Sequence, residues 1–270
     1  MTRHIERLSE IAADYDAVVF DQWGVLHNGS APYGGAIECL ATLPCPAAVL
    51  SNSGKRAAPN AARIRDMGFE TPFNTVMTSG EALWRDIEGA RVPETRFHAV
   101  ERAAGDAAAW GQGLSIEMTA LENAEAILLM GLPDGTNLEA WQPLLEDALT
   151  RQLPLYCSNP DRKSPRKDGY VISPGAVAFA YREMGGAVSF YGKPHQPIFD
   201  SLAHAMGTSK LLMVGDSLEH DIAGASAAGW DSVLVGGGLY AETFNAAPWQ
   251  EALTALAPPH APTFFIGEVQ

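Results

Sequence analysis

The chain has 270 residues, of which 47% are hydrophobic and 9% aromatic, so it is long enough to bury a sizeable core and has an ordinary globular composition. Its formal net charge of −14 repels nucleic acid and anionic lipid, so we expect neither as a partner. The same charge repels a phosphorylated small molecule, and a site for such a ligand therefore needs a local cation or a metal ion.

Cysteine usage and hydropathy bound the environment of the protein. The three cysteines are scattered along the chain and form neither a disulfide framework nor a C-x-x-C metal signature, so we expect reduced thiols. The charged N-terminus lacks an apolar signal core, and no apolar run approaches the roughly 18 residues of a membrane helix. We expect a cytoplasmic protein that does not bind membranes.

In chain order, short apolar runs alternate with amphipathic stretches, which predicts βα units and a mainly parallel sheet. The predicted strands are 16–21, 47–53, 96–100, 125–132, 154–159, 187–194, 210–217, 231–238 and 263–267. The predicted helices are 33–43, 59–69, 137–150, 176–186, a segment from about 196, 220–229 and 248–256, with a polar, basic loop at 160–169. Periodicity alone indicates an α/β protein and leaves open whether its middle is a separate module.

Polar side chains follow four of the predicted strands. They are Asp21, the run Ser51-Asn52-Ser53, Lys193, and Asp216 with Asp221. Taken singly, such residues are commonly turn formers, helix caps or solvated side chains. Because ligands of open parallel sheets bind at the carboxyl ends of strands, their joint occurrence predicts a site.

Together these residues supply what phosphoryl transfer to a carboxylate requires. Asp21 could attack phosphorus and form an aspartyl phosphate. Asp21 and Asp216 offer hard oxygen ligands for Mg²⁺, and Asp221 could support them as a ligand or as an acceptor behind the ligands. Ser51 and nearby backbone N–H groups could hold phosphoryl oxygens, and Lys193 could neutralise both phosphate and nucleophile.

The ordered motifs DQWGVL, SNSG, YGKP and VGDSLEHD resemble those of the haloacid dehalogenase superfamily of phosphatases. The chain is similar in particular to the class IIA branch, which contains nitrophenylphosphatases and sugar-phosphate phosphatases. The G-V-L after Asp21, the Asn-Pro-Asp at 159–161, the Pro-Gly-Ala at 174–176 and the long interval between SNSG and YGKP carry this narrower resemblance.

The resemblance implies a Rossmann-like, doubly wound parallel-sheet core at residues 1–75 and 188–270, with an α/β cap domain inserted at 76–187. It implies a magnesium-dependent phosphatase acting on a small phosphorylated metabolite such as a sugar phosphate, and by analogy a homodimer formed through the cap. The implied roles are Asp21 as nucleophile with Lys193 as its catalytic partner; Asp21, the backbone carbonyl of Trp23, Asp216 and Asp221 around the metal; and Ser51, Asn52, Ser53, Trp23, Asn159 and Asp161 facing the substrate.

A second motif match has to be weighed against this one. Residues 215–218 spell the GDSL of a lipase family, in which Ser217 would be the nucleophile. That family needs a later Asp-x-x-His, and none follows Ser217 here. The esterase interpretation therefore lacks its context.

Trp23 departs from the phosphatase pattern, which places a second aspartate two residues after the nucleophile. Indole neither donates an acidic proton nor acts as a base, so the usual acid/base group is missing. Three interpretations stay open: His27, His195 or His220 replaces it; the substrate has a good leaving group; or the protein binds a phosphorylated ligand with little turnover, as a regulatory protein would. Trp23 could equally be a packing residue at the junction of core and cap.

Overall fold

The computed structural model describes residues 2–70, 73–166 and 169–270. The chain divides into two compact units, which are described separately below. The first unit comprises Met1–Ser51, Ala58–Met77 and Lys193–Gln270, and the second comprises Asn52–Ala57 and Thr78–Gly192. The short segment Asn52–Ala57 groups with the second unit, although the expected division at 75 and 188 leaves it in the core. The assignment of the two units as core and cap stays a prediction.

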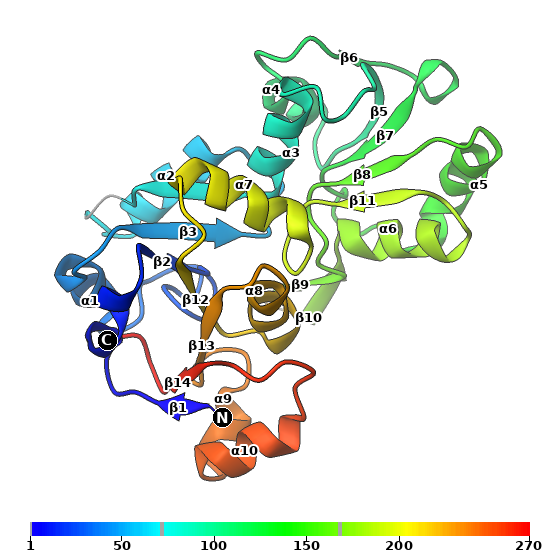
Figure 1. Cartoon of the computed structure of the whole chain (residues 1–270). Helices are drawn as coiled ribbons and strands as arrows, with labels where there is room; N and C mark the ends of the chain where they lie inside the picture. Colours follow the sequence, from blue (N-terminus) through cyan, green and yellow to red (C-terminus); the bar gives the residue numbers. More distant parts are fainter. Residues whose placement is uncertain (1, 71–72, 167–168) are drawn as a thin grey trace. The chain divides into compact units, whose positions relative to one another are not determined.

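The first unit is built on a seven-stranded sheet whose order is β1-β14-β13-β12-β2-β3-β4, and the described pairs within it are parallel (Figure 1). Its middle strands are almost wholly buried, as expected for a parallel sheet covered on both faces. The strands are β1 (Arg3–His4), β2 (Ala17–Phe20), β3 (Ala47–Ser51), β4 (Thr75–Thr78), β12 (Leu211–Gly215), β13 (Asp231–Val235) and β14 (Phe264–Ile266).

Helices connect these strands and supply the rest of the core of the first unit. They are α1 (Ala36–Thr42), α2 (Ala57–Asp66), α7 (Gln196–Met206), α8 (Ala223–Ala227), α9 (Ala241–Ala246) and α10 (Trp249–Leu256), with one π-helical turn at Leu218–Ile222 before α8. One large buried cluster includes Val18, Phe20, Val49, Val214 and Val233. The apolar runs of the sequence therefore become the interior of this unit.

The second unit has its own five-stranded parallel sheet, of order β11-β8-β7-β5-β6, and its own core. The strands are β5 (Arg96–Val100), β6 (Glu117–Met118), β7 (Ala126–Leu129), β8 (Leu155–Cys157) and β11 (Val188–Phe190). The helices are α3 (Ser79–Glu88), α4 (Asp106–Trp110), α5 (Gln142–Thr150) and α6 (Pro174–Glu183).

The prediction of a polar loop at 160–169 is wrong in part. This segment contains β9 (Lys163–Arg166), which pairs antiparallel with β10 (Gly169–Ile172) as a separate two-stranded sheet. This hairpin was not predicted because its strands are too polar to show the apolar alternation of a half-buried strand. Lys167 and Asp168 of that segment lie outside the described residues.

The order of the first sheet places two strand ends where a ligand would bind. From β2 the chain proceeds to β3 and β4 on one side, whereas β12, β13 and β14 lie on the other. The strand order therefore reverses between β2 and β12. Such a topological switch point leaves a crevice at the carboxyl ends of the two strands. Asp21 and Asp216 directly follow these ends.

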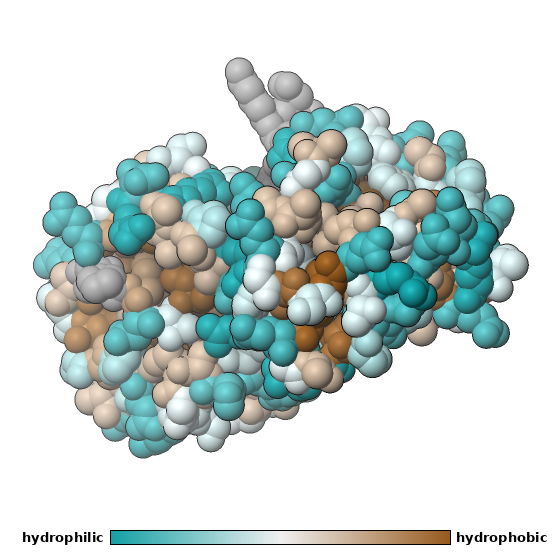
Figure 2. Space-filling model, turned by 90° about the horizontal axis from the view of Figure 1, so that it is seen from above, coloured by the Kyte–Doolittle hydropathy of each residue, from teal (hydrophilic) through white to brown (hydrophobic). Residues whose placement is uncertain are grey.

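Figure 2 shows hydrophilic residues over much of the visible face, with hydrophobic residues in smaller patches. Within the described ranges, no helix has both the length and the apolarity needed to cross a membrane.

Candidate active site

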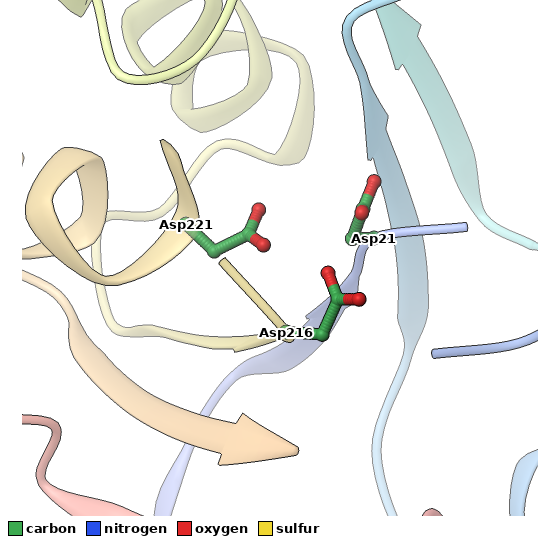
Figure 3. A group of neighbouring side chains, drawn as sticks. All are labelled: Asp21, Asp216 and Asp221. Carbon is green, nitrogen blue, oxygen red and sulfur yellow. The ribbon is translucent and has the colours of Figure 1, made fainter. Parts of the chain in front are cut away.

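Three carboxylates meet at the switch point of the first sheet. Asp21 follows β2, Asp216 follows β12, and Asp221 lies in the π-helical turn after β12; Figure 3 shows their side chains turned toward a common space. One oxygen from each lies within 4.8 Å of those of the other two. The parallel pairing of β2 with β12 fixes this approach, because the Asp21 N–H donates to the Val214 carbonyl at 2.9 Å.

Lys193 joins two of these carboxylates. Its Nζ lies 2.7 Å from Oδ1 of Asp21 and 2.7 Å from Oδ1 of Asp221, and only 3% of the side chain is exposed. Burial disfavours the ammonium, but the two carboxylates outweigh burial and raise the pKa of Lys193 above its ordinary value. Lys193 is therefore a fixed cation in the cluster.

Asp221 is fully buried, and its two carboxylate oxygens link Lys193 to the backbone of the turn after β12. Its Oδ2 accepts the Ser217 N–H at 3.0 Å while its Oδ1 pairs with Lys193. A β-carbon on Gly215 would stand 2.2 Å from the Asp221 side chain, so a glycine is needed there. The Ser217 hydroxyl accepts the His220 N–H at 3.1 Å and caps the helical turn, which identifies Ser217 as a capping residue.

Asp216 sits in a cradle formed by two glycines. A β-carbon on Gly24 would stand 1.8 Å from the Asp216 Oδ2, and one on Gly238 would stand 2.4 Å from it. The Leu239 N–H donates to the same oxygen at 2.8 Å. Burial, followed by the charges of Asp21 and Asp221, raises the pKa of the Asp216 carboxyl. The backbone here makes room for one carboxylate and orients it.

The charge balance of the cluster fits a cation. Burial raises the pKa of Asp21, with Asp221 adding to the effect and Lys193 opposing it. Among the described residues of the cluster, three carboxylates face one ammonium, so the fully ionised group is short of positive charge. A divalent cation would supply this charge, and hard carboxylate oxygens with a glycine cradle are suited to Mg²⁺.

Trp23 lies in the turn after Asp21 and remains 50% exposed. Its indole packs over Gly29, where a β-carbon would stand 2.2 Å from the ring, and meets the His27 ring edge-on with centroids 6.0 Å apart. The turn therefore holds the indole on one side and leaves much of it uncovered. The expected contribution of its backbone carbonyl to a metal site stays a prediction.

The three histidines considered as replacement acid/base groups have different environments. His27 is completely buried, and its Nδ1 accepts the Gly29 N–H at 3.1 Å. Burial lowers the pKa of His27 to about 4, with Arg63 contributing, so its ring is neutral at pH 7. His195 is the residue before α7, and the His220 N–H is used in the cap of Ser217. His27 is thus a buried structural residue.

The remaining predicted residues divide between the two units. Ser51 ends β3 in the first unit, whereas Asn52 and Ser53 group with the second. Within the second unit, the Asn52 Nδ2 donates to the Asp161 Oδ1 at 2.7 Å, and the Asp161 N–H donates to the Asn159 Oδ1 at 3.0 Å. The predicted residues therefore form one carboxylate–lysine cluster in the first unit and one amide–carboxylate group in the second.

The sequence-based prediction missed the backbone that positions the carboxylates. Gly238 and the N–H groups of Ser217 and Leu239 were not predicted, and Gly24 entered only as part of the G-V-L motif. The run of three glycines at 236–238 is the signal that could have indicated a close approach of backbone to a side chain. A backbone N–H donor leaves no such signal in the side-chain sequence.

Two family models match the chain. Residues 18–101 match a model described as haloacid dehalogenase-like hydrolase, and residues 190–268 match one described as HAD-hydrolase-like. The two matches include the Asp21 turn and the segment containing Lys193, Asp216 and Asp221.

Individual proteins are similar over most of the chain. A D-glycerol 3-phosphate phosphatase from Mycobacterium tuberculosis is 30% identical over 235 residues, which is 84% of this chain and 65% of that protein. The chain thus spans slightly less than two thirds of that curated relative's length. A haloacid dehalogenase-like hydrolase from Brucella suis 1330 is 26% identical, with a TM-score of 0.79 over 98% of this chain and 100% of that one. A glycerol phosphate phosphatase from M. tuberculosis, solved in complex with magnesium, is 26% identical, with a TM-score of 0.73 over 96% of this chain and 77% of that one.

Proposed function

This chain belongs to the haloacid dehalogenase-like hydrolases, and we propose that it is a phosphoric monoester hydrolase acting on a small phosphorylated metabolite. The observation that carries the proposal is the position of Asp21, which directly follows the strand at the switch point and lies 2.7 Å from Lys193 within a three-carboxylate cluster. The phosphatase activity of the M. tuberculosis relative supports the reaction class.

Asp21 is the proposed nucleophile. One of its carboxylate oxygens attacks phosphorus while the ester P–O bond breaks and the organic part of the substrate leaves with that oxygen. The resulting aspartyl phosphate is then hydrolysed by water, which releases phosphate and restores the carboxylate. Lys193 is buried against Asp21, so its charge lowers the repulsion between the carboxylate and an incoming phosphate dianion. Asp221 is a positioning residue because it fixes Lys193 through a second 2.7 Å contact.

Asp21 and Asp216, together with the backbone carbonyl of Trp23, are the proposed ligands of Mg²⁺, and Asp221 supports them. The magnesium complex of the relative from M. tuberculosis supports this cofactor. When bound, the ion supplies positive charge to the phosphoryl oxygens. The protein's part is to hold Asp216 in the cradle of Gly24 and Gly238, with one oxygen oriented by the Leu239 N–H.

Ser51, Asn52, Ser53, Asn159 and Asp161 are the proposed substrate contacts. Ser51 lies at the end of β3, the strand next to β2, which suits a group that binds phosphoryl oxygens. The hydrogen bond between Asn52 and Asp161 orients both polar groups within the second unit. Both would then present fixed polar atoms to the organic part of a metabolite.

A second function is favoured by one observation, the indole at residue 23. A protein that lacks the carboxyl group there could bind a phosphorylated ligand with little turnover and act as a regulator. The loss of acid/base help is worth roughly 10² to 10⁴ in rate. Phosphate monoester hydrolysis requires an acceleration approaching ~10²¹, so the nucleophile, lysine and metal would still provide most of the catalysis. We therefore prefer the enzyme.

A panel of phosphorylated metabolites with and without Mg²⁺ tests the proposal. We expect magnesium-dependent release of phosphate by the wild type and its loss in Asp21→Asn, which keeps the shape of the side chain and removes its charge. Asp14→Asn is a matched control, since Asp14 is exposed and outside the cluster. Equal rates in wild type and Asp21→Asn would contradict the nucleophile, and ligand binding without turnover would favour the regulator.

A further inference from the structure

Two large apolar side chains are exposed directly beside the carboxylate cluster of the first unit. Trp23 is 50% exposed and Leu239 is 64% exposed. Each neighbours one of the two glycines that enclose Asp216, because Trp23 precedes Gly24 and Leu239 follows Gly238. These residues therefore border the place at which phosphorus would be attacked.

The position of Leu239 is fixed by its backbone. Its N–H donates to the Asp216 Oδ2 at 2.8 Å, and a β-carbon on Gly238 would stand 2.7 Å from the Gly24 carbonyl oxygen. The segment 238–239 thus lies on the turn at 23–24. The Leu239 side chain is left largely outside the core, although its main chain is bound to the site.

The indole of Trp23 is also held without being covered. Gly29 and the His27 ring support it, and half of its surface is still accessible. Covering an exposed, supported aromatic ring with an apolar group is favourable, because apolar surface is removed from water. The part of a bound substrate that is not the phosphate would supply such a group.

The turn supplies no proton to a leaving group. Residue 23 carries an indole, which is neither an acid nor a base at neutral pH. The His27 ring is completely buried, and its Nδ1 is occupied as the acceptor of the Gly29 N–H. Because this turn supplies no acid, an ester whose leaving group departs as a stable anion is suited to the site.

We propose that this site selects aryl phosphates, with the aryl ring resting against Trp23 and Leu239; the inference rests on the phosphatase function proposed above. A phenol such as tyrosine ionises near pH 10, whereas hydroxyl groups with the acidity of water ionise only at a far higher pH, so a phenolate leaves without a proton. Asp21 forms a bond to phosphorus while the P–O bond to the aryl oxygen breaks, and the electron pair departs on the phenolate. Water then cleaves the aspartyl phosphate, so that aryl phosphate and water yield phenolate and dihydrogen phosphate.

The first test compares aryl phosphates of graded leaving-group acidity with glycerol 3-phosphate, all with Mg²⁺. We expect kcat/KM for phenyl phosphate to exceed that for glycerol 3-phosphate by at least about 10²-fold, the lower range for acid catalysis that an alkyl leaving group lacks here. Trp23→Ala and Leu239→Ala should each raise KM for aryl esters at least about fivefold and change KM for glycerol 3-phosphate little. Leu138→Ala removes an exposed leucine of the second unit and is the matched control.

The second test measures binding without turnover. Titration calorimetry on Asp21→Asn should show phenylphosphonate binding at least about tenfold tighter than methylphosphonate, and Trp23→Ala in that background should remove the difference. Equal binding of the two phosphonates, or an equal kcat/KM for glycerol 3-phosphate and phenyl phosphate, would overturn the inference and leave the phosphatase standing. Absence of turnover for every ester would overturn the phosphatase, and the phosphonate comparison would still decide the aryl site.

Discussion

Gly24 lies so close to Asp216 that a β-carbon at residue 24 would stand 1.8 Å from the carboxylate Oδ2. The φ angle of Gly24 is +77°, in the left-handed region that side chains rarely adopt. Steric space and backbone conformation therefore both require a glycine. The turn after β2 is built to accept a carboxylate that arrives from β12.

Gly24→Ala should consequently displace the Asp216 carboxylate and weaken Mg²⁺ binding at least about tenfold, because one oriented ligand is lost. Titration calorimetry with Mg²⁺ measures this change. Gly207→Ala is a close control: its φ is +71° and no atom lies within 4 Å of the added β-carbon, so it carries the strain of about 1 kcal/mol without the collision. Equal Mg²⁺ affinity in the two variants would show that the cradle does not govern binding.

The contact of Lys193 with Asp221 makes a prediction about stability. Lys193→Met removes the cation and leaves Asp221 buried without its charge partner, which should cost about 3–5 kcal/mol of unfolding free energy. Adding Asp221→Asn removes the unpaired charge, so the double variant should be more stable than Lys193→Met alone. Urea unfolding at pH 7 measures the unfolding free energies of the wild type, Lys193→Met and the double variant.

A matched second substitution separates this coupling from a general effect of lowering the negative charge. Asp14→Asn in the Lys193→Met background removes an exposed carboxylate far along the chain from the cluster and should restore nothing. If it restores as much stability as Asp221→Asn, the gain comes from net charge and the pairing has no special role.

His27 makes a prediction about pH. Its folded-state pKa is about 4 because of burial, below its ordinary value of 6.5, so between these values the unfolded chain binds more protons. The contribution of neutral His27 to stability is complete above pH 6.5 and is lost as the pH falls toward 4. His27→Gln should lose this dependence, which amounts to about 2 kcal/mol between pH 7 and 4.5. Urea unfolding of His27→Gln and of the exposed-site control His260→Gln at both pH values checks it; equal slopes would contradict it.

The sequence predicted the polar strand ends because buried parallel strands leave continuous apolar runs, and ligand sites lie where those runs stop. Three of these ends, after β2, β3 and β12, belong to the first sheet, whereas Lys193 follows β11 of the second unit's sheet. Asp21, Asp216 and Asp221 were singled out by their positions after such strands, and in the structure one oxygen from each lies within 4.8 Å of those of the other two. The basic hairpin β9–β10 was missed because its polar strands lack that signal. The close approach of Gly24 to Asp216 could not be predicted either, because it depends on how two turns that are distant in the sequence pack together.

Asn52 shows a different limit. Its neighbour Ser51 ends a strand of the first sheet, yet Asn52 groups with the second unit and binds Asp161, 109 residues further along the chain. In the sequence, the polar run at 51–53 predicts a single turn. Only the packing of the following segment, in which Glu81 accepts from Arg56 Nε at 2.7 Å, shows that its residues divide between units.

The absence of an acid/base group at residue 23 predicts the kinetics of an ester with a good leaving group. For p-nitrophenyl phosphate the first step needs no proton, whereas hydrolysis of the aspartyl phosphate needs a water molecule to be deprotonated. Trp23 cannot accept that proton. The second step should therefore limit turnover, and rapid mixing of the wild type should release about one p-nitrophenolate per chain before a slower steady rate.

Trp23→Asp places a carboxylate where the water must be activated, so it should raise the steady rate by about 10² or more and reduce the initial burst. Trp23→Asn controls for the loss of the indole, because it has a similar shape and no basic oxygen of carboxylate strength. Both variants lose the same apolar surface, and any difference between them reports proton transfer. Linear release from the first turnover in wild type, with equal steady rates in the Asp and Asn variants, would place the limiting barrier before the aspartyl phosphate and remove residue 23 from the second step.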